Sequence, residues 1–128
     1  MDKLFKGKPV KVVITGKALE SFEELTKTVA EEISKGITSS NHQTLFNSIR
    51  RKVELLKENP HCGTQVQKNL IPKEYIEIYD ASNLWKLNLP GALRMIYTIR
   101  TNEVKIIALI LDVLKHRKYE KKFGYKKS

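Results

Sequence analysis

The chain has 128 residues, 41% of them apolar and 30% charged, which suits one folded domain with a modest core and excludes a disordered chain. Lysine and arginine outnumber aspartate and glutamate by 24 to 14, so the net charge is +10. Such an excess of positive charge attracts a polyanion, which would be a nucleic acid, an anionic membrane or an acidic protein. Seven of these cations lie between Lys115 and Lys127, which favours a binding surface over a charge kept for solubility.

No segment predicts a membrane anchor. The longest strictly apolar run, Ile106 to Leu111, is too short to span a bilayer, and lysines interrupt the N-terminal region. The single Cys62 excludes an internal disulfide and is typical of a reducing compartment, so we expect a cytoplasmic protein. Because His61 and Cys62 have no second pair of ligands at a useful spacing, we expect no metal and no cofactor.

The first half of the chain predicts a short strand and an amphipathic helix. Apolar residues alternate between Val10 and Ile14, which indicates the strand. Ser21 and Glu24 form a capping box that would start the helix, and Gly36 stands where a left-handed residue would end it.

A second amphipathic helix follows directly. Ser40 and Gln43 form another capping box at its start, and Asn59-Pro60 ends it. Two helices joined by a short linker make an αα-hairpin, whose apolar stripe we assign to the core.

The second half predicts a sheet. Residues 61–83 are irregular, with a helical turn opened by Pro72. From Leu84 the apolar period becomes two, which indicates strands over residues 84–89 and 93–100. The nearly continuous apolar run of residues 104–111 indicates a third strand that is covered on both faces. We therefore predict a single α+β domain over residues 1–128, with a short N-terminal strand, an αα-hairpin, a three-stranded antiparallel meander and a short C-terminal helix.

The register of this meander decides which polar residues meet. Leu89 should pair with Leu93 across Pro90-Gly91-Ala92, because this odd loop keeps the apolar residues of both strands on one face. A two-residue turn at Thr101-Asn102 then extends the opposite face onto the third strand. That face is predicted to be cationic and to carry Lys86, Asn88, Arg94, Thr98, Arg100 and Lys105.

Four segments of the sequence resemble the RelE/ParE toxin superfamily. They are Leu84-Trp85-Lys86-Leu87, the strand from Leu93 to Ile99, the strand from Val104 to Leu109, and His116-Arg117 through Tyr119. The ending Tyr119-Glu120-Lys121-Lys122-Phe123-Gly124-Tyr125 is similar to that of archaeal-type RelE-like members. The resemblance implies the toxin of a type II toxin–antitoxin pair, which cleaves mRNA on the ribosome and is held inactive by a cognate antitoxin. ParE-like members share the fold but poison a DNA topoisomerase, and this alternative stays open.

Metal-independent RNA cleavage needs a base for the 2′-hydroxyl, a cation for the phosphorane and an acid for the leaving oxygen. Arg94 suits the phosphate, because a guanidinium binds it bidentately; its alternative role is an ion pair with Glu103 or Asp112. Lys86 serves either as a base or as a phosphate contact.

The basic tail supplies the remaining candidates. His116 titrates near physiological pH and is either a proton-transfer group or an ordinary exposed histidine. Tyr119 is assigned to base stacking, whereas Phe123 and Tyr125 are assigned to packing against the sheet. Further contacts to RNA are predicted for Asn88, Arg100, Lys105, Lys115, Arg117 and Lys118.

Two further expectations concern the whole molecule. A non-catalytic RNA- or ribosome-binding module is an alternative to the nuclease, because Lys86 is followed by Leu87 and Asn88 instead of further basic residues. The antitoxin should be an acidic, partly disordered chain that covers the groove beside the αα-hairpin and the basic tail. Truncation after Leu114 is expected to leave a folded domain, with the core supplied by the strands and the two helices.

Overall fold

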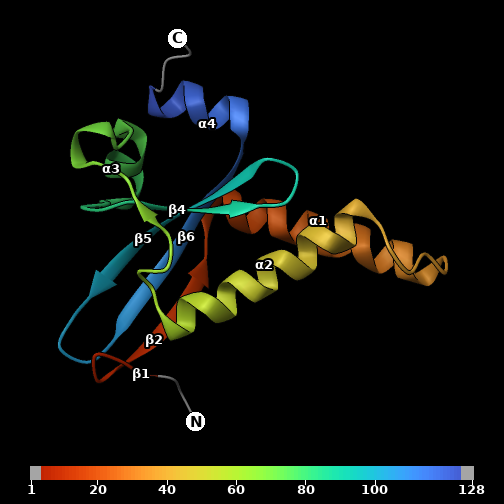
Figure 1. The fold of residues 1–128 in the computed structure, drawn as a ribbon, viewed down its shortest axis with the longest axis horizontal. Coiled ribbons are helices and arrows are strands. Elements are labelled where there is room, and N and C mark those ends of the chain that lie inside the picture. The colour runs from red at the N-terminus through yellow and green to blue at the C-terminus, as the bar shows by residue number, and fades with distance from the viewer. Residues whose placement is uncertain (1–3, 125–128) are drawn as a thin grey trace.

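A computed structural model of the chain describes residues 4–124. It is an α+β structure in which four α-helices surround a single six-stranded mixed sheet (Figure 1). The elements in chain order are β1 (Leu4–Phe5), β2 (Lys8–Ile14), α1 (Gly16–Ser34), α2 (Asn41–Glu58), β3 (Thr64–Gln65), the 3₁₀ helix η1 (Lys68–Leu70), α3 (Lys73–Tyr79), β4 (Trp85–Leu89), β5 (Leu93–Thr101), β6 (Ile106–Lys115) and α4 (His116–Phe123).

The sheet differs from the predicted three-stranded meander. Its strand order is β1-β2-β6-β5-β4-β3, and β2 pairs in parallel with β6, with Val12 opposite Ala108. The predicted arrangement of an N-terminal strand, an αα-hairpin and a three-strand meander is therefore wrong. Local alternation of apolar residues indicates that a segment is a strand, but it does not indicate a partner almost a hundred residues away. The two-residue strands β1 and β3 are too short to show any period.

The register within the central strands agrees with the apolar pattern. Leu89 pairs with Leu93 and Trp85 pairs with Tyr97, as predicted from the odd loop. The next turn was predicted incorrectly. Thr101 pairs with Ile106, so the loop has four residues, and the Asn102 side chain closes it by accepting two backbone N–H bonds of 2.8 Å. Lys105 consequently lies in this loop instead of on the sheet.

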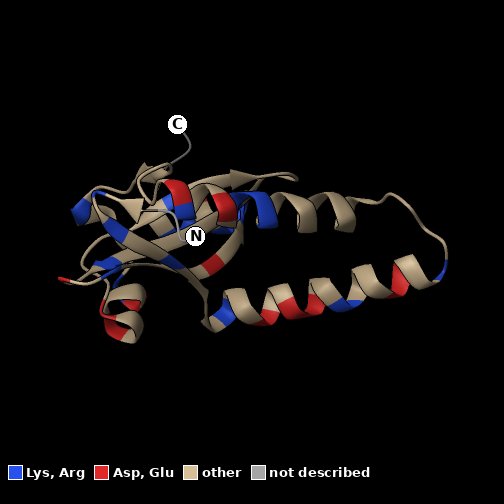
Figure 2. Ribbon diagram, turned by 90° about the horizontal axis from the view of Figure 1, so that it is seen from below, with Lys and Arg blue, Asp and Glu red and all other residues tan. Residues whose placement is uncertain are grey.

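Helices α1 and α2 cover one face of the sheet. The buried residues of this layer form what we call the hairpin core: Ala18, Ile49, Leu56, Leu89, Met95, Tyr97, Ala108 and Ile110. Beyond the edge of the sheet the two helices continue as a protruding hairpin (Figures 1 and 2).

The start of α1 was misplaced by the sequence pattern, whereas its end and the start of α2 were not. Gly16 has a φ of +59° and turns the chain straight from β2 into the helix, so the Ser21 capping box is not used. Gly36, with a φ of +80°, follows the C-cap of α1. Ser40 caps α2 as predicted, because its Oγ accepts a 3.1 Å hydrogen bond from the Gln43 N–H.

The second face of the sheet is covered as well. Its buried residues form what we call the α4 core: Val66, Ile71, Tyr75, Ala81, Leu84, Ile96, Leu111, Leu114, Tyr119 and Phe123. These residues come from the sheet, from α3 and α4, and from the segments that flank α3. The expectation that the strands and two helices supply the core without the tail is wrong, because Tyr119 and Phe123 are 3% and 2% exposed.

In the part of the chain that the structure describes, no helix combines the length and the apolar character needed to cross a membrane.

Candidate functional site

The structure brings three of the predicted site residues together on the face of the sheet that α3 and α4 cover. Asn88 of β4 pairs with Arg94 of β5, and Lys86 lies two residues along β4 on the same face. Leu93 pairs with Lys115, so the start of α4 lies at this same end of the strands. We call this region the α4 end of the sheet.

Lys86 and Arg94 are both half-buried there. The Lys86 ammonium lies 5.0 Å from the centre of the Tyr119 ring, a cation–π contact. The Arg94 guanidinium donates a 3.3 Å hydrogen bond to the Leu93 carbonyl. Both cations therefore sit against the protein with part of their surface still open to a ligand.

Tyr119 is placed differently from its predicted role. Its ring stacks on Phe123 at a centroid distance of 4.4 Å and belongs to the α4 core. A base needs an exposed ring face on which to stack, and the buried Tyr119 ring does not present one. Packing, which the sequence assigned to Phe123 and Tyr125, thus applies to Tyr119 and Phe123; Tyr125 lies outside the described residues.

Arg100 and Lys105 are not part of this region. Six residues of extended strand separate Arg94 from Arg100, which corresponds to about 20 Å. Arg100 donates a hydrogen bond to the Tyr79 carbonyl and so caps the end of α3. Lys105 is exposed in the loop that follows β5. The predicted continuous cationic face is therefore split between the two ends of β5, and apolar residues of the α4 core lie between them.

Helix α4 adds exposed positive charge to the α4 end of the sheet. Lys115 is its N-cap, Arg117 and Lys118 are exposed in its first turns, and no acidic residue lies in its first turn. Cations near a helix N-terminus oppose the helix dipole, so an anion bound there would relieve an unfavourable arrangement. The side chain of His116 lies outside the described part of the structure.

A buried cluster of charged and polar groups between α3, α4 and β6 was not predicted. Asp112 is 5% exposed and accepts a 3.2 Å hydrogen bond from the Tyr75 hydroxyl. The Lys122 ammonium lies 3.7 Å from Asp112 Oδ2 and also forms an ion pair with Glu74. Burial, with a smaller contribution from Lys17, lowers the pKa of Lys122. The one signal in the sequence is Asp112 itself, an acid within the apolar run of β6.

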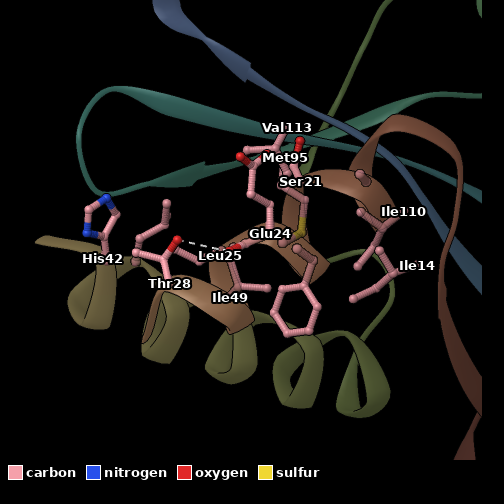
Figure 3. A pocket seen from close by; sticks show the side chains of 13 residues that line it. Ile14, Ser21, Glu24, Leu25, Thr28, His42, Ile49, Met95, Ile110 and Val113 are labelled. Carbon is pink, nitrogen blue, oxygen red and sulfur yellow. Dashed lines mark hydrogen bonds between the residues drawn. The ribbon is translucent and has the colours of Figure 1, made fainter. Parts of the chain in front are cut away.

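An apolar groove lies on the other side of the sheet, between α1, α2 and β6, with a volume of about 280 Å³. Figure 3 shows Ile14 and Ile110 at one end and His42 and Thr28 at the other. Glu24 is an exposed residue of its lining. The helix that carries Glu24, α1, contains five glutamates and two lysines, and its acidic bands are visible in Figure 2.

Among residues 4–124, no three His, Cys, Asp or Glu side chains come together in a way that would hold a metal ion. Cys62 is exposed, and partial burial of its sulfur raises the pKa of the thiol. A thiol with a raised pKa is a weak nucleophile at neutral pH, so Cys62 does not add a reactive group.

Comparison with known proteins gives no assignment, since no protein-family model, no curated protein and no solved structure matches the chain.

Proposed function

We propose that the protein is the toxin of a type II toxin–antitoxin pair, a RelE-type endoribonuclease that cleaves mRNA on the ribosome through the 2′-hydroxyl. The observation that carries this proposal is the grouping of Lys86, Asn88 and Arg94 beside the cationic first turns of α4. A phosphate placed there would meet a guanidinium that retains its charge and a lysine that is partly desolvated. Arg94 would stabilise the phosphorane, and Lys86 with His116 would transfer protons or contact phosphate.

Induced expression of the protein in a bacterial host, followed by mapping of mRNA ends, tests this proposal. We expect growth arrest and cleavage in phase with codons, both lost in Arg94→Ala. Arg51→Ala is the matched control, because it removes an exposed arginine of α2 outside the α4 end of the sheet. Arrest with DNA damage and without RNA cleavage would instead support a ParE-like poison of topoisomerase.

A second candidate is a non-catalytic RNA- or ribosome-binding module. The burial of Tyr119 favours it, because a buried ring leaves fewer groups at the α4 end of the sheet for stacking or proton transfer. Both candidates predict RNA binding that weakens with salt. RNA cleavage distinguishes the two candidates. If the wild-type protein binds ribosomes programmed with mRNA but does not cleave that mRNA, the binding module is supported.

The proposed partner is an acidic antitoxin that is partly disordered before it binds. Complementary charge would direct it to the exposed cations of α4, and its apolar side chains would fill the groove between α1, α2 and β6. The gene of this partner should be sought beside the gene of this chain, and co-expression of the acidic protein that it encodes should restore growth. A neighbouring chain that binds RNA-free toxin but fails to restore growth would contradict this assignment.

A further inference from the structure

An ion cluster links helix α4 to α3 and β6, in addition to the packing of the α4 residues Tyr119 and Phe123. The Lys122 side chain is 17% exposed and lies between a carboxylate of α3 and a carboxylate of β6. Glu74 Oε1 is sealed from solvent, and the Lys122 ammonium lies against it. The same ammonium lies 5.2 Å from the centre of the Tyr75 ring. Lys122 therefore links α4 to both α3 and β6.

This cluster depends on the lysine. A buried carboxylate that loses its cation keeps the full cost of desolvation, which exceeds the loss of any exposed salt bridge. Asp112, which is 5% exposed, would lose its cation and retain the Tyr75 hydroxyl as a donor. Glu74, whose side chain is 35% exposed but whose Oε1 is sealed from solvent, would be left without the cation that lies against it. Loss of the Lys122 charge thus acts on the junction between α4 and α3.

The two cores share no helix. The described residues of the hairpin core come from α1, α2 and the sheet, whereas those of the α4 core come from α3, α4, the sheet and the segments beside α3. Regions whose contacts are separated in this way open separately, because breaking one set leaves the other intact.

We propose that α4 is a cover that opens as a unit while the hairpin core stays folded. The ion pairs of the Lys122 ammonium with Glu74 and Asp112 hold this cover closed. Opening withdraws Tyr119 and Phe123 from the sheet and uncovers Ile96 and Leu114. It also separates the cations of α4 from Lys86 and Arg94, so the α4 end of the sheet exists only in the closed state. This inference rests on the packing alone and stands whether or not the protein cleaves RNA.

Hydrogen exchange of the full-length protein, measured by mass spectrometry, tests the proposal. In Lys122→Met, amides in the second half of α4 should exchange at least tenfold faster than in the wild type, and those of α1 and α2 should stay within twofold. Lys121→Met is the matched control: it removes the same charge from an exposed neighbour on α4 and should leave both regions within twofold.

A double variant distinguishes loss of the Lys122 ion pairs from a general loss of side-chain packing. Adding Glu74→Gln to Lys122→Met removes the stranded carboxylate, and α4 exchange should slow by at least threefold relative to Lys122→Met. Unchanged α4 exchange in Lys122→Met overturns the proposal, as does an equal acceleration of α1, α2 and α4. If Lys122→Met does not fold, the single variant Glu74→Gln tests the proposal. Faster exchange confined to α3 and α4 supports the role of the Lys122 ion pairs, and exchange at the wild-type rate excludes it.

Discussion

The ring of Tyr119 lies between Phe123 and the Lys86 ammonium, with 3% of the residue exposed. Truncation to alanine would leave a cavity in the α4 core, and such losses of a buried aromatic ring cost about 3–5 kcal/mol. We therefore expect Tyr119→Ala to lower the free energy of unfolding by this amount in urea titrations. Tyr119→Phe keeps the ring and should lower it by much less. Equal losses in the two variants would contradict the packing role.

The Tyr119→Phe variant also tests the proposed RNA cleavage. Tyr119→Phe removes only the hydroxyl, so a purely structural Tyr119 predicts that the variant still arrests growth and still produces codon-phased mRNA ends. A folded but inactive Tyr119→Phe protein would show that the hydroxyl takes part in proton transfer after all.

Strand register made part of the site predictable at the scale of single residues. Lys86, Asn88 and Arg94 were placed on one face because the apolar pattern of two neighbouring strands permits one register. The burial of Tyr119 was not predictable, because the basic residues around it gave the tail the composition of an exposed segment. The hydrogen bond of Arg100 was not predictable either, because its acceptor, the Tyr79 carbonyl, lies in a region without a clear periodic pattern.

At the scale of elements, Glu32 joins the end of α1 to the start of α2. Its carboxylate accepts hydrogen bonds from Ser40 and Gln43 and lies 2.9 Å from His42 Nδ1. The hydrogen bonds from Ser40 and His42 hold the pKa of Glu32 below its usual value.

This lowered pKa gives a pH dependence with a definite sign. A carboxyl whose pKa is lower in the folded state stabilises the fold above its unfolded pKa, near 4.5, and loses that effect as the pH falls through the folded pKa. Glu32→Gln should therefore melt below the wild type at pH 7, and the difference in melting temperature should shrink as the pH falls below 4.5. A difference that does not shrink on acidification would show that the Glu32 charge is not the cause.

Elements with strong local signals were predictable, and those that depend on distant partners were not. Ser40 and Gly36 mark helix ends through their own hydrogen bonds and backbone angles, so their sequence signals held. The bulge between Ile96 and Tyr97 in the pairing with β6 has no local signature. The length of α3 was underestimated for the same reason, since its inward side chain, Tyr75, is held by Asp112 from another element.

At the scale of the whole molecule, removal of the C-terminal segment tests how much the α4 core contributes to the stability of the fold. Truncation after Leu114 deletes both Tyr119 and Phe123, and the loss of each buried aromatic residue costs about 3–5 kcal/mol. We expect this chain to keep the hairpin core folded, to unfold at a lower urea concentration than the full chain, and to bind a hydrophobic dye at the uncovered face of the sheet. Truncation after Gly124 is the matched control, because it keeps the α4 core, and it should unfold as the full chain does.

The positive net charge of the molecule makes the proposed RNA binding testable through its dependence on salt. Each phosphate contact to single-stranded RNA contributes about 0.7 to the slope of log affinity against log salt. Arg94→Ala should therefore reduce the slope by about 0.7, and Lys115→Ala by a similar amount, in fluorescence anisotropy titrations with a short oligonucleotide. Arg51→Ala should leave the slope unchanged, and a fall equal to that of Arg94→Ala would locate binding elsewhere.

The parallel pairing of β2 with β6 has a consequence for how the protein is made. Val10 is paired with Ile106, 96 positions further along the chain, so the middle of the sheet cannot close until the chain has been synthesised beyond residue 106. Pairings of such long sequence separation form slowly, because the intervening chain must first lose its freedom. The α1–α2 hairpin can form early, but the α4 end of the sheet needs the last strand and the last helix. The α4 end of the sheet therefore stays unassembled in the nascent chain until residues 116–123 have been synthesised.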